Sequence, residues 1–222
     1  MDARTTLTIA LAKGRLLAET VTLFARAGLD AGALADPGRR LLVELPPQRL
    51  GGGAVEATRL RALVLKPDDV PTYVERGAAD CGICGSDVLR EQGRDLYEPL
   101  DLGIGRCRLV LAGPAGAAPA AGTVRIATKL VATAQAWADA RGLPVEIIRL
   151  SGSVELAPTA GLADRIVDLV QSGETLRANG LVELETIAEV TARFVVNRAA
   201  LKLKRGAFEG LLAALRAAGA AS

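Results

Sequence analysis

The sequence predicts an α/β fold with two successive units, each built around a mostly parallel sheet. Apolar runs of strand length alternate with segments whose apolar residues recur at helical spacing, a pattern typical of βαβ units. Half of the 222 residues are hydrophobic, so the chain can bury a large core. Because aromatic residues make up only 3% of the chain, Leu, Val, Ile and Ala are expected to form that core.

The N-terminal half is expected to begin with a strand over residues 7–11. A turn at Lys13-Gly14-Arg15 joins this strand to a helix that Gly28 closes. Further strands are expected over residues 41–45, 60–65, 80–85 and 109–112, and short helices are expected to open at residues 68 and 86.

The C-terminal half repeats the alternation of strands and helices. Strands are expected over residues 124–127, 145–150, 166–170, 181–187 and 193–196. Helices are expected over residues 131–140 and 153–156, from about residue 174, and over residues 208–215. No internal repeat is evident.

Charge and composition exclude several classes of function. The net charge is only +2 and the basic residues are spread along the chain, so a nucleic-acid partner is not expected. The chain has no histidine, which excludes a Ser-His-Asp triad and a histidine general base. Any chemistry must therefore use carboxylates, Lys, Arg, hydroxyls, backbone amides or a bound metal.

The sequence shows no recognisable signal peptide or membrane-spanning segment. Residues 1–5 lead directly into a short apolar strand rather than a signal peptide. No segment reaches the roughly 18 unbroken apolar residues of a membrane span. A cytoplasmic location is therefore expected.

The three cysteines allow one alternative function. Their odd number does not suit a disulfide framework, and Cys81-Gly-Ile-Cys84 lacks the second ligand pair of a zinc site. A thioredoxin-like redox role for this CxxC remains as an alternative. Otherwise Cys81 and Cys84 are interpreted as packing residues.

The most informative stretch is residues 166–176, an apolar strand followed by a polar turn and a helix. Gly173 permits a tight turn, and Ser172 and Thr175 add hydroxyl donors, a combination that suits a phosphate cup. Asp168 lies two residues before the end of the strand, where it is suited to ribose hydroxyls or a magnesium ion. Glu174 would repel a phosphate unless its side chain points to solvent. An ordinary strand-turn-helix is the alternative interpretation.

Several motifs, taken together and in order, resemble those of the short form of ATP phosphoribosyltransferase. They comprise Lys13-Gly14-Arg15-Leu16, residues 69–83, Glu155-Leu156-Ala157-Pro158, residues 161–164, and residues 168–181. The resemblance covers about residues 5–205. It implies a two-lobed α/β fold like that of the type II periplasmic binding proteins, with a substrate cleft between the lobes. Residues 1–91 and 181–222 would form the first lobe, and residues 92–180 the second.

The resemblance implies a reaction in which N1 of the adenine of ATP displaces pyrophosphate from phosphoribosyl pyrophosphate, the first step of histidine biosynthesis. The loop formed by Ser172, Gly173, Glu174, Thr175 and Leu176 would hold the 5′-phosphate. Asp168 and Glu155 would bind the ribose or Mg²⁺, the expected cofactor.

The resemblance also implies basic residues that stabilise the leaving pyrophosphate. Arg15 and Arg39 are the catalytic candidates, with Arg40 as the alternative to Arg39. The ATP site would comprise Lys13, Gly14, Arg15, Asp80 and Gly85. Surface ion pairing is the alternative role for the basic residues.

The short form implies partners as well as substrates. We expect a homodimer that assembles with a regulatory subunit similar to histidyl-tRNA synthetase into a hetero-octamer. The alternatives are a solute-binding protein, which would need export, and the effector-sensing domain of a transcription regulator, which would need a DNA-binding helix-turn-helix.

Overall fold

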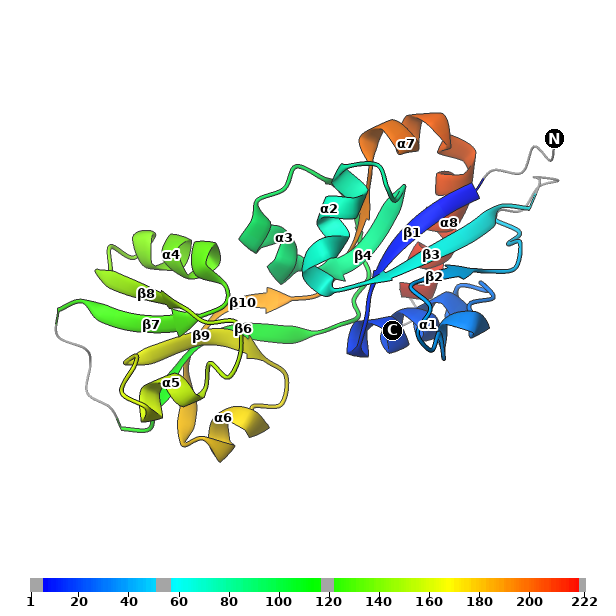
Figure 1. The fold of residues 1–222 in the computed structure, drawn as a ribbon. Helices are drawn as coiled ribbons and strands as arrows, with labels where there is room; N and C mark the ends of the chain where they lie inside the picture. Colours follow the sequence, from blue (N-terminus) through cyan, green and yellow to red (C-terminus); the bar gives the residue numbers. More distant parts are fainter. Residues whose placement is uncertain (1–5, 51–56, 117–121, 220–222) are drawn as a thin grey trace. The chain divides into compact units, whose positions relative to one another are not determined.

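The computed structural model describes residues 6–50, 57–116 and 122–219, and the chain divides into two compact units. Unit 1 comprises residues 1–89, 93–105 and 191–222, and unit 2 comprises residues 90–92 and 106–190. Each unit contains one sheet between layers of helices (Figure 1). The N-terminal residues 1–5, from which the absence of a leader is predicted, lie outside the described residues.

The sheet of unit 1 has six strands in the order β2-β3-β1-β4-β11-β5. The strands are β1 (Thr6–Ala12), β2 (Leu42–Glu44), β3 (Arg59–Leu65), β4 (Cys81–Gly85), β5 (Tyr97–Asp101) and β11 (Ala192–Val196). β1 pairs in parallel with both β3 and β4, whereas β2, β11 and β5 join in antiparallel fashion. The carboxyl ends of β1, β3 and β4 therefore meet at one edge.

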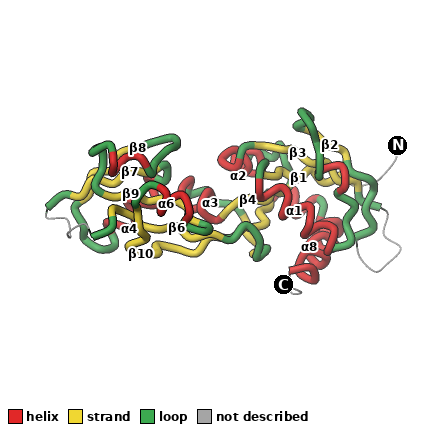
Figure 2. Tube along the Cα trace, turned by 90° about the horizontal axis from the view of Figure 1, so that it is seen from below, coloured by secondary structure: helices red, strands yellow, loops and turns green. Residues whose placement is uncertain are grey.

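Helices cover both faces of this sheet, because the inner strands β1 and β4 carry buried residues on both faces (Figures 1 and 2). On one face, α1 (Arg15–Arg26) and α8 (Arg205–Gly219) bury Phe24 and Phe208 against β1 and β3. On the other face, α2 (Val70–Glu75) and α3 (Ser86–Gln92) pack against β4. The short 3₁₀ helices η1 (Gly32–Leu34) and η2 (Pro67–Asp69) and helix α7 (Arg198–Leu203) complete the unit.

The sheet of unit 2 has five strands in the order β10-β6-β9-β7-β8. The strands are β6 (Cys107–Pro114), β7 (Val124–Thr128), β8 (Val145–Arg149), β9 (Arg165–Val170) and β10 (Leu181–Val190). β7 pairs in parallel with β8 and β9, and β6 pairs in antiparallel fashion with β9 and β10. Helix α4 (Val131–Asp139) covers one face, and α5 (Leu156–Thr159) and α6 (Glu174–Ala178) cover the other.

The prediction of mostly parallel sheets is wrong, because both sheets are mixed. The cause is the path of the chain, which leaves unit 1 through β6 and returns through β10 and β11. Each returning strand pairs in antiparallel fashion with its neighbour. Apolar periodicity identifies a strand but carries no information on the direction of its partner.

The predicted lobe boundaries also differ from the observed units. β5 pairs with β11 in the sheet of unit 1, so residues 93–105 do not belong to the second lobe. β10 pairs along its length with β6, so residues 181–190 belong to unit 2 and the return begins at Thr191. β5 and α7 are additional to the predicted elements.

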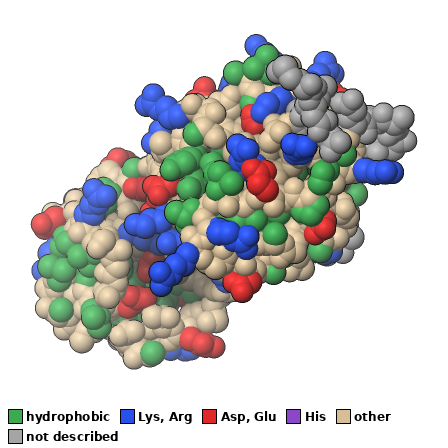
Figure 3. Space-filling model, turned by 45° about the vertical axis from the view of Figure 1, so that its right-hand side comes forward, with side chains coloured by type: hydrophobic (Ala, Val, Ile, Leu, Met, Phe, Trp, Pro, Cys, Tyr) green, Lys and Arg blue, Asp and Glu red, His purple; other side chains and the backbone are tan. Residues whose placement is uncertain are grey.

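The surface carries both signs of charge. Basic and acidic side chains occur side by side on the face drawn in Figure 3, in line with the low net charge. Within residues 6–50, 57–116 and 122–219, no helix is long and apolar enough to cross a membrane.

Candidate functional site

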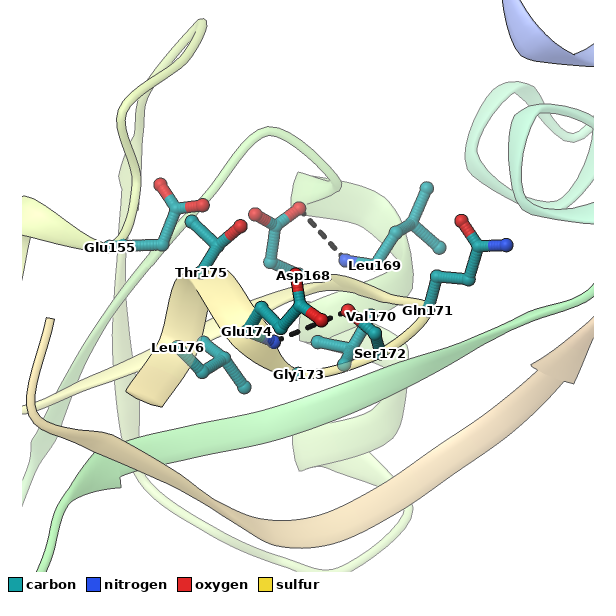
Figure 4. Close-up of a pocket in the computed structure, with 10 residues that line it drawn as sticks. All are labelled: Glu155, Asp168, Leu169, Val170, Gln171, Ser172, Gly173, Glu174, Thr175 and Leu176. Atoms are coloured by element: carbon teal, nitrogen blue, oxygen red, sulfur yellow. Dashed lines mark hydrogen bonds between the residues drawn. The ribbon is translucent and has the colours of Figure 1, made fainter. Parts of the chain in front are cut away.

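A pocket of about 260 Å³ lies at the carboxyl end of β9 in unit 2 (Figure 4). Glu155 and every residue from Asp168 to Leu176 line it. The structure thus brings together all of the residues that the sequence assigned to phosphoribosyl pyrophosphate. Figure 4 shows the side chains of Glu155, Asp168 and Thr175 extending to the same side of the loop.

The loop that forms the pocket depends on Gly173 for two reasons. Its φ is +74°, a backbone conformation that favours glycine. In addition, a Cβ at this position would lie 3.0 Å from Nη1 of Arg177, whose guanidinium donates a hydrogen bond of 3.1 Å to the carbonyl of Ser172. This hydrogen bond from Arg177 stabilises the turn.

The polar groups of the loop remain accessible to a ligand. Ser172, Glu174 and Thr175 are exposed, and Ser172 Oγ accepts a long hydrogen bond of 3.4 Å from the amide of Glu174. Glu174 is exposed but also lines the pocket, so its carboxylate lies beside the loop that the phosphate would occupy.

The carboxyl group of Asp168 is the electrostatically unusual member of the pocket. Burial raises its pKa above the ordinary value, although the backbone amide of Leu169, which donates a hydrogen bond of 2.8 Å, acts to lower it. Lys129 also lowers this pKa, and Glu155 raises it. Sequence reasoning did not single out Lys129, although its place two residues after the expected strand over residues 124–127, directly after the observed β7, was a usable signal.

A second set of predicted residues lies at the carboxyl edge of the sheet in unit 1. Lys13, Gly14 and Arg15 follow β1, and Gly85 ends the neighbouring β4. Gly14 has φ +88°, so the chain turns sharply there before α1. Both basic side chains are exposed. This arrangement places four of the five predicted ATP contacts at one edge.

Arg15 is held by a carboxylate that also binds the backbone. Arg15 Nη1 lies 2.5 Å from Glu19 Oε1, and the other carboxylate oxygen of Glu19 accepts a hydrogen bond of 2.6 Å from the amide of Gly105. Glu19 therefore links Arg15 to the end of the segment that leaves unit 1.

Asp80, the fifth predicted ATP contact, lies elsewhere. It precedes β4 at the amino end of the strand, on the opposite edge from Lys13 and Gly85. Both of its oxygens lie 2.8 Å from Lys204 Nζ, and one accepts a hydrogen bond of 2.7 Å from the amide of Thr8. The assignment of Asp80 to the ATP site is therefore corrected to a structural role that ties β4 and β1 to α7.

Arg39 and Arg40 lie in an exposed turn between η1 and β2. Arg40 Nε donates a hydrogen bond of 3.2 Å to the carbonyl of Pro37, which directs its side chain back onto the turn. No hydrogen bond or ion pair of the Arg39 side chain is recorded within the described ranges. This difference favours Arg39 as the residue available to a ligand.

The two cysteines of the CxxC lie on opposite faces of β4. Cys81 packs in the cluster with α1 and α8, whereas Cys84 packs in the cluster with α2 and α3. Burial raises the pKa of both thiols, that of Cys84 to about 12. Both are free and buried. The geometry excludes a disulfide between them and supports their interpretation as packing residues.

Comparison with known proteins places these residues in context. A family model described as ATP phosphoribosyltransferase matches residues 66–217. "ATP phosphoribosyltransferase 2" of Geobacter sulfurreducens is 51% identical over 203 residues, covering 89% of this chain and 91% of that protein. "ATP phosphoribosyltransferase" of Anaeromyxobacter sp. (strain K) is 50% identical, covering 97% and 95%.

Solved structures agree with the sequence comparisons. A chain of the "ATP phosphoribosyl transferase (HisG:HisZ) complex from Thermotoga maritima" superposes with a TM-score of 0.77 at 33% identity, covering 97% of this chain and 100% of that chain. A "Putative L-Cystine ABC transporter from Listeria monocytogenes" superposes with a TM-score of 0.56 at 11% identity, covering 94% and 89%. At 11% identity, the second match shows only that the two folds are similar.

The corrected role of Asp80 leads to a stability prediction. Asp80→Asn removes the negative charge beside the half-buried ammonium of Lys204, so the free energy of unfolding is expected to fall by about 2 kcal/mol. The KM for ATP should not change. Asp95→Asn, which breaks an exposed pair with Arg198, is the control and should cost under about 0.5 kcal/mol. Urea unfolding and steady-state kinetics measure both, and an Asp80→Asn protein of normal stability with a raised KM would contradict the structural role.

The raised pKa of Asp168 leads to a prediction with a defined sign. Folding disfavours the charged carboxylate, so stability is lost as the pH rises from 3.8 through the raised pKa. Asp168→Asn should therefore raise the urea midpoint at pH 7, with a gain that shrinks towards pH 4. Asp164→Asn is the control of opposite sign, because hydrogen bonds from Arg125 lower the pKa of Asp164. A lower midpoint for Asp168→Asn at pH 7 would contradict the burial cost.

Proposed function

The chain belongs to the ATP phosphoribosyltransferase family, and on that premise we propose which of its residues bind the two substrates and act on them. The enzyme transfers the phosphoribosyl group of phosphoribosyl pyrophosphate to N1 of the adenine of ATP and releases pyrophosphate, the first step of histidine biosynthesis. The pocket at the end of β9 is the observation that carries the assignment of residues.

Phosphoribosyl pyrophosphate binds in this pocket with its 5′-phosphate on the loop from Ser172 to Leu176. The exposed hydroxyls of Ser172 and Thr175 and the amides of the turn are the donors for the phosphate oxygens. The carboxylates of Asp168 and Glu155, which extend to the same side of the loop, accept hydrogen bonds from the ribose hydroxyls (Figure 4). This pose explains why acidic groups line a site for an anionic substrate.

Mg²⁺ is the proposed cofactor, and the donor set fits it only in part. Carboxylate oxygens of Asp168 and Glu155 are the hard ligands that Mg²⁺ prefers. Within the described residues, no group of three or more Asp, Glu, Cys or His side chains could hold a metal ion. Most ligands would therefore come from substrate phosphates and water. When bound, the ion supplies positive charge to the departing pyrophosphate.

The chain's own catalytic task is to orient the substrates and stabilise the leaving group. As the bond at C1 of the ribose breaks, negative charge grows on pyrophosphate, and the guanidinium of Arg15 and the ammonium of Lys13 are suited to bind it. Arg39 is the third candidate cation. Adenine N1 is itself the nucleophile, so no strong base is required, and a chain without histidine can perform the reaction.

The enzyme works as the catalytic subunit of a larger assembly in the cytoplasm. Two copies form a homodimer, which joins a regulatory subunit similar to histidyl-tRNA synthetase in a hetero-octamer. The similar Thermotoga maritima chain comes from a HisG:HisZ complex, which supports a second subunit here. Neither nucleic acid nor a membrane is a partner.

The function is tested by direct assay. The protein, mixed with ATP, phosphoribosyl pyrophosphate, Mg²⁺, the partner subunit and pyrophosphatase, is expected to form phosphoribosyl-ATP. Asp168→Ala should raise the dissociation constant for phosphoribosyl pyrophosphate about tenfold or more and leave that for ATP unchanged, because the lost contacts are to the ribose. Asp139→Ala, on the exposed side of α4, is the control. Absence of product would refute the activity, and equal losses for both substrates would refute the role of Asp168.

The assignment of the arginines is tested by turnover. Arg15→Ala and Arg39→Ala are each expected to lower kcat by about 10- to 100-fold without lowering the melting temperature, because both side chains are exposed. Arg205→Ala breaks a pair with Glu209 of the same i,i+4 spacing and is the matched control. Arg40→Ala should leave kcat unchanged. A normal kcat for Arg15→Ala or Arg39→Ala would contradict the catalytic role of that residue and indicate that it is an ordinary surface charge.

A further inference from the structure

The charged residues that line the pocket at the end of β9 are all acidic, although the proposed substrate is an anion. Its lining includes three acids, Glu155, Asp168 and Glu174, and neither lysine nor arginine is among the residues that line it. Phosphoribosyl pyrophosphate carries a phosphate at one end of the ribose and a pyrophosphate at the other. Positive charge must therefore come from groups just outside the lining.

Sheet register places Lys129 beside Asp168. β7 and β9 run in parallel, with Thr128 opposite Val167, and Lys129 and Asp168 are the next residues on each strand path. Two residues earlier on each path, Ala127 and Ile166 pack in the same core cluster, under α5 and α6. Because side chains alternate between faces, Lys129 and Asp168 lie on that same face, at the carboxyl edge of the sheet.

The backbone around Lys129 is held in place while its side chain stays exposed. The buried hydroxyl of Thr128 donates a hydrogen bond of 2.7 Å to the carbonyl of Val167 and accepts one of 2.9 Å from the amide of Leu130. No hydrogen bond or ion pair of the Lys129 ammonium is recorded in the part of the chain that the structure describes.

Asp168 lies between Lys129 and the phosphate loop. The loop leads into α6, which packs against β10 on one side of β9, whereas Lys129 follows β7 on the other side. A ribose bound at Asp168 with its 5′-phosphate on the loop would direct its opposite end, which bears the pyrophosphate, towards β7. We propose that Lys129 binds a pyrophosphate oxygen of phosphoribosyl pyrophosphate, an inference that rests on the proposed function of this pocket.

The inference requires a specific pattern of ligand binding. Lys129→Met should weaken the binding of Mg²⁺-pyrophosphate and of phosphoribosyl pyrophosphate by about tenfold or more, as expected for loss of one charge-assisted hydrogen bond. Ribose 5-phosphate lacks the pyrophosphate, so its binding should not change. Lys129→Arg keeps the charge and should recover most of the loss. Calorimetric titration of the full chain with each ligand measures these constants.

A matched control separates a local effect from a general loss of positive charge. Lys202→Met removes an exposed lysine from α7 in unit 1 and should leave all three ligands unaffected. Unchanged binding of pyrophosphate and phosphoribosyl pyrophosphate to Lys129→Met would overturn the inference. So would an equal loss of ribose 5-phosphate, which would assign the lysine to the 5′-phosphate. If the wild-type chain itself failed to bind phosphoribosyl pyrophosphate, the proposed function of the pocket would fail instead.

Discussion

The parallel pairing of β7 with β9 is the constraint on which the candidate site depends. It brings two strand ends to one edge of the sheet, so Asp168 and the loop after it share that edge with Lys129. The buried hydroxyl of Thr128 reinforces the pairing with a hydrogen bond to Val167. Ligands of open α/β sheets bind at the carboxyl ends of strands for this reason, because polar turns collect there above an apolar core.

The pocket contains residues that lower the stability of the folded protein. Asp168 is a partly buried acid whose charged form folding disfavours. Gly173 adopts a left-handed conformation over the guanidinium of Arg177, which braces the carbonyl of Ser172. An asparagine at residue 168 would remove the cost of burying a charge. A turn without a left-handed residue would not need the hydrogen bond from Arg177. Such local costs are typical of functional sites.

The sequence predicted the elements of the fold better than their pairing. Strand and helix positions follow from local periodicity, so nearly all were found, but the mixed sheets and the return of the chain at Thr191 depend on contacts far apart in the sequence. The loop from Ser172 to Leu176 was predictable because its residues are contiguous. Asp80 was misplaced because a motif does not distinguish the two ends of a strand, and Lys129 was missed because its neighbour Asp168 is 39 residues away.

The candidate site residues of the two units differ in charge. In unit 1 the exposed cations Lys13 and Arg15 follow one strand, and Glu19 ties Arg15 to Gly105, where the chain leaves the unit. In unit 2 the pocket is lined by acids that suit ribose hydroxyls. An acid-lined pocket can select the sugar without stabilising the charge that develops on the leaving group. In the proposed function that second task falls to cations on neighbouring strand ends and to Mg²⁺, so different chemistry would recognise each end of the substrate.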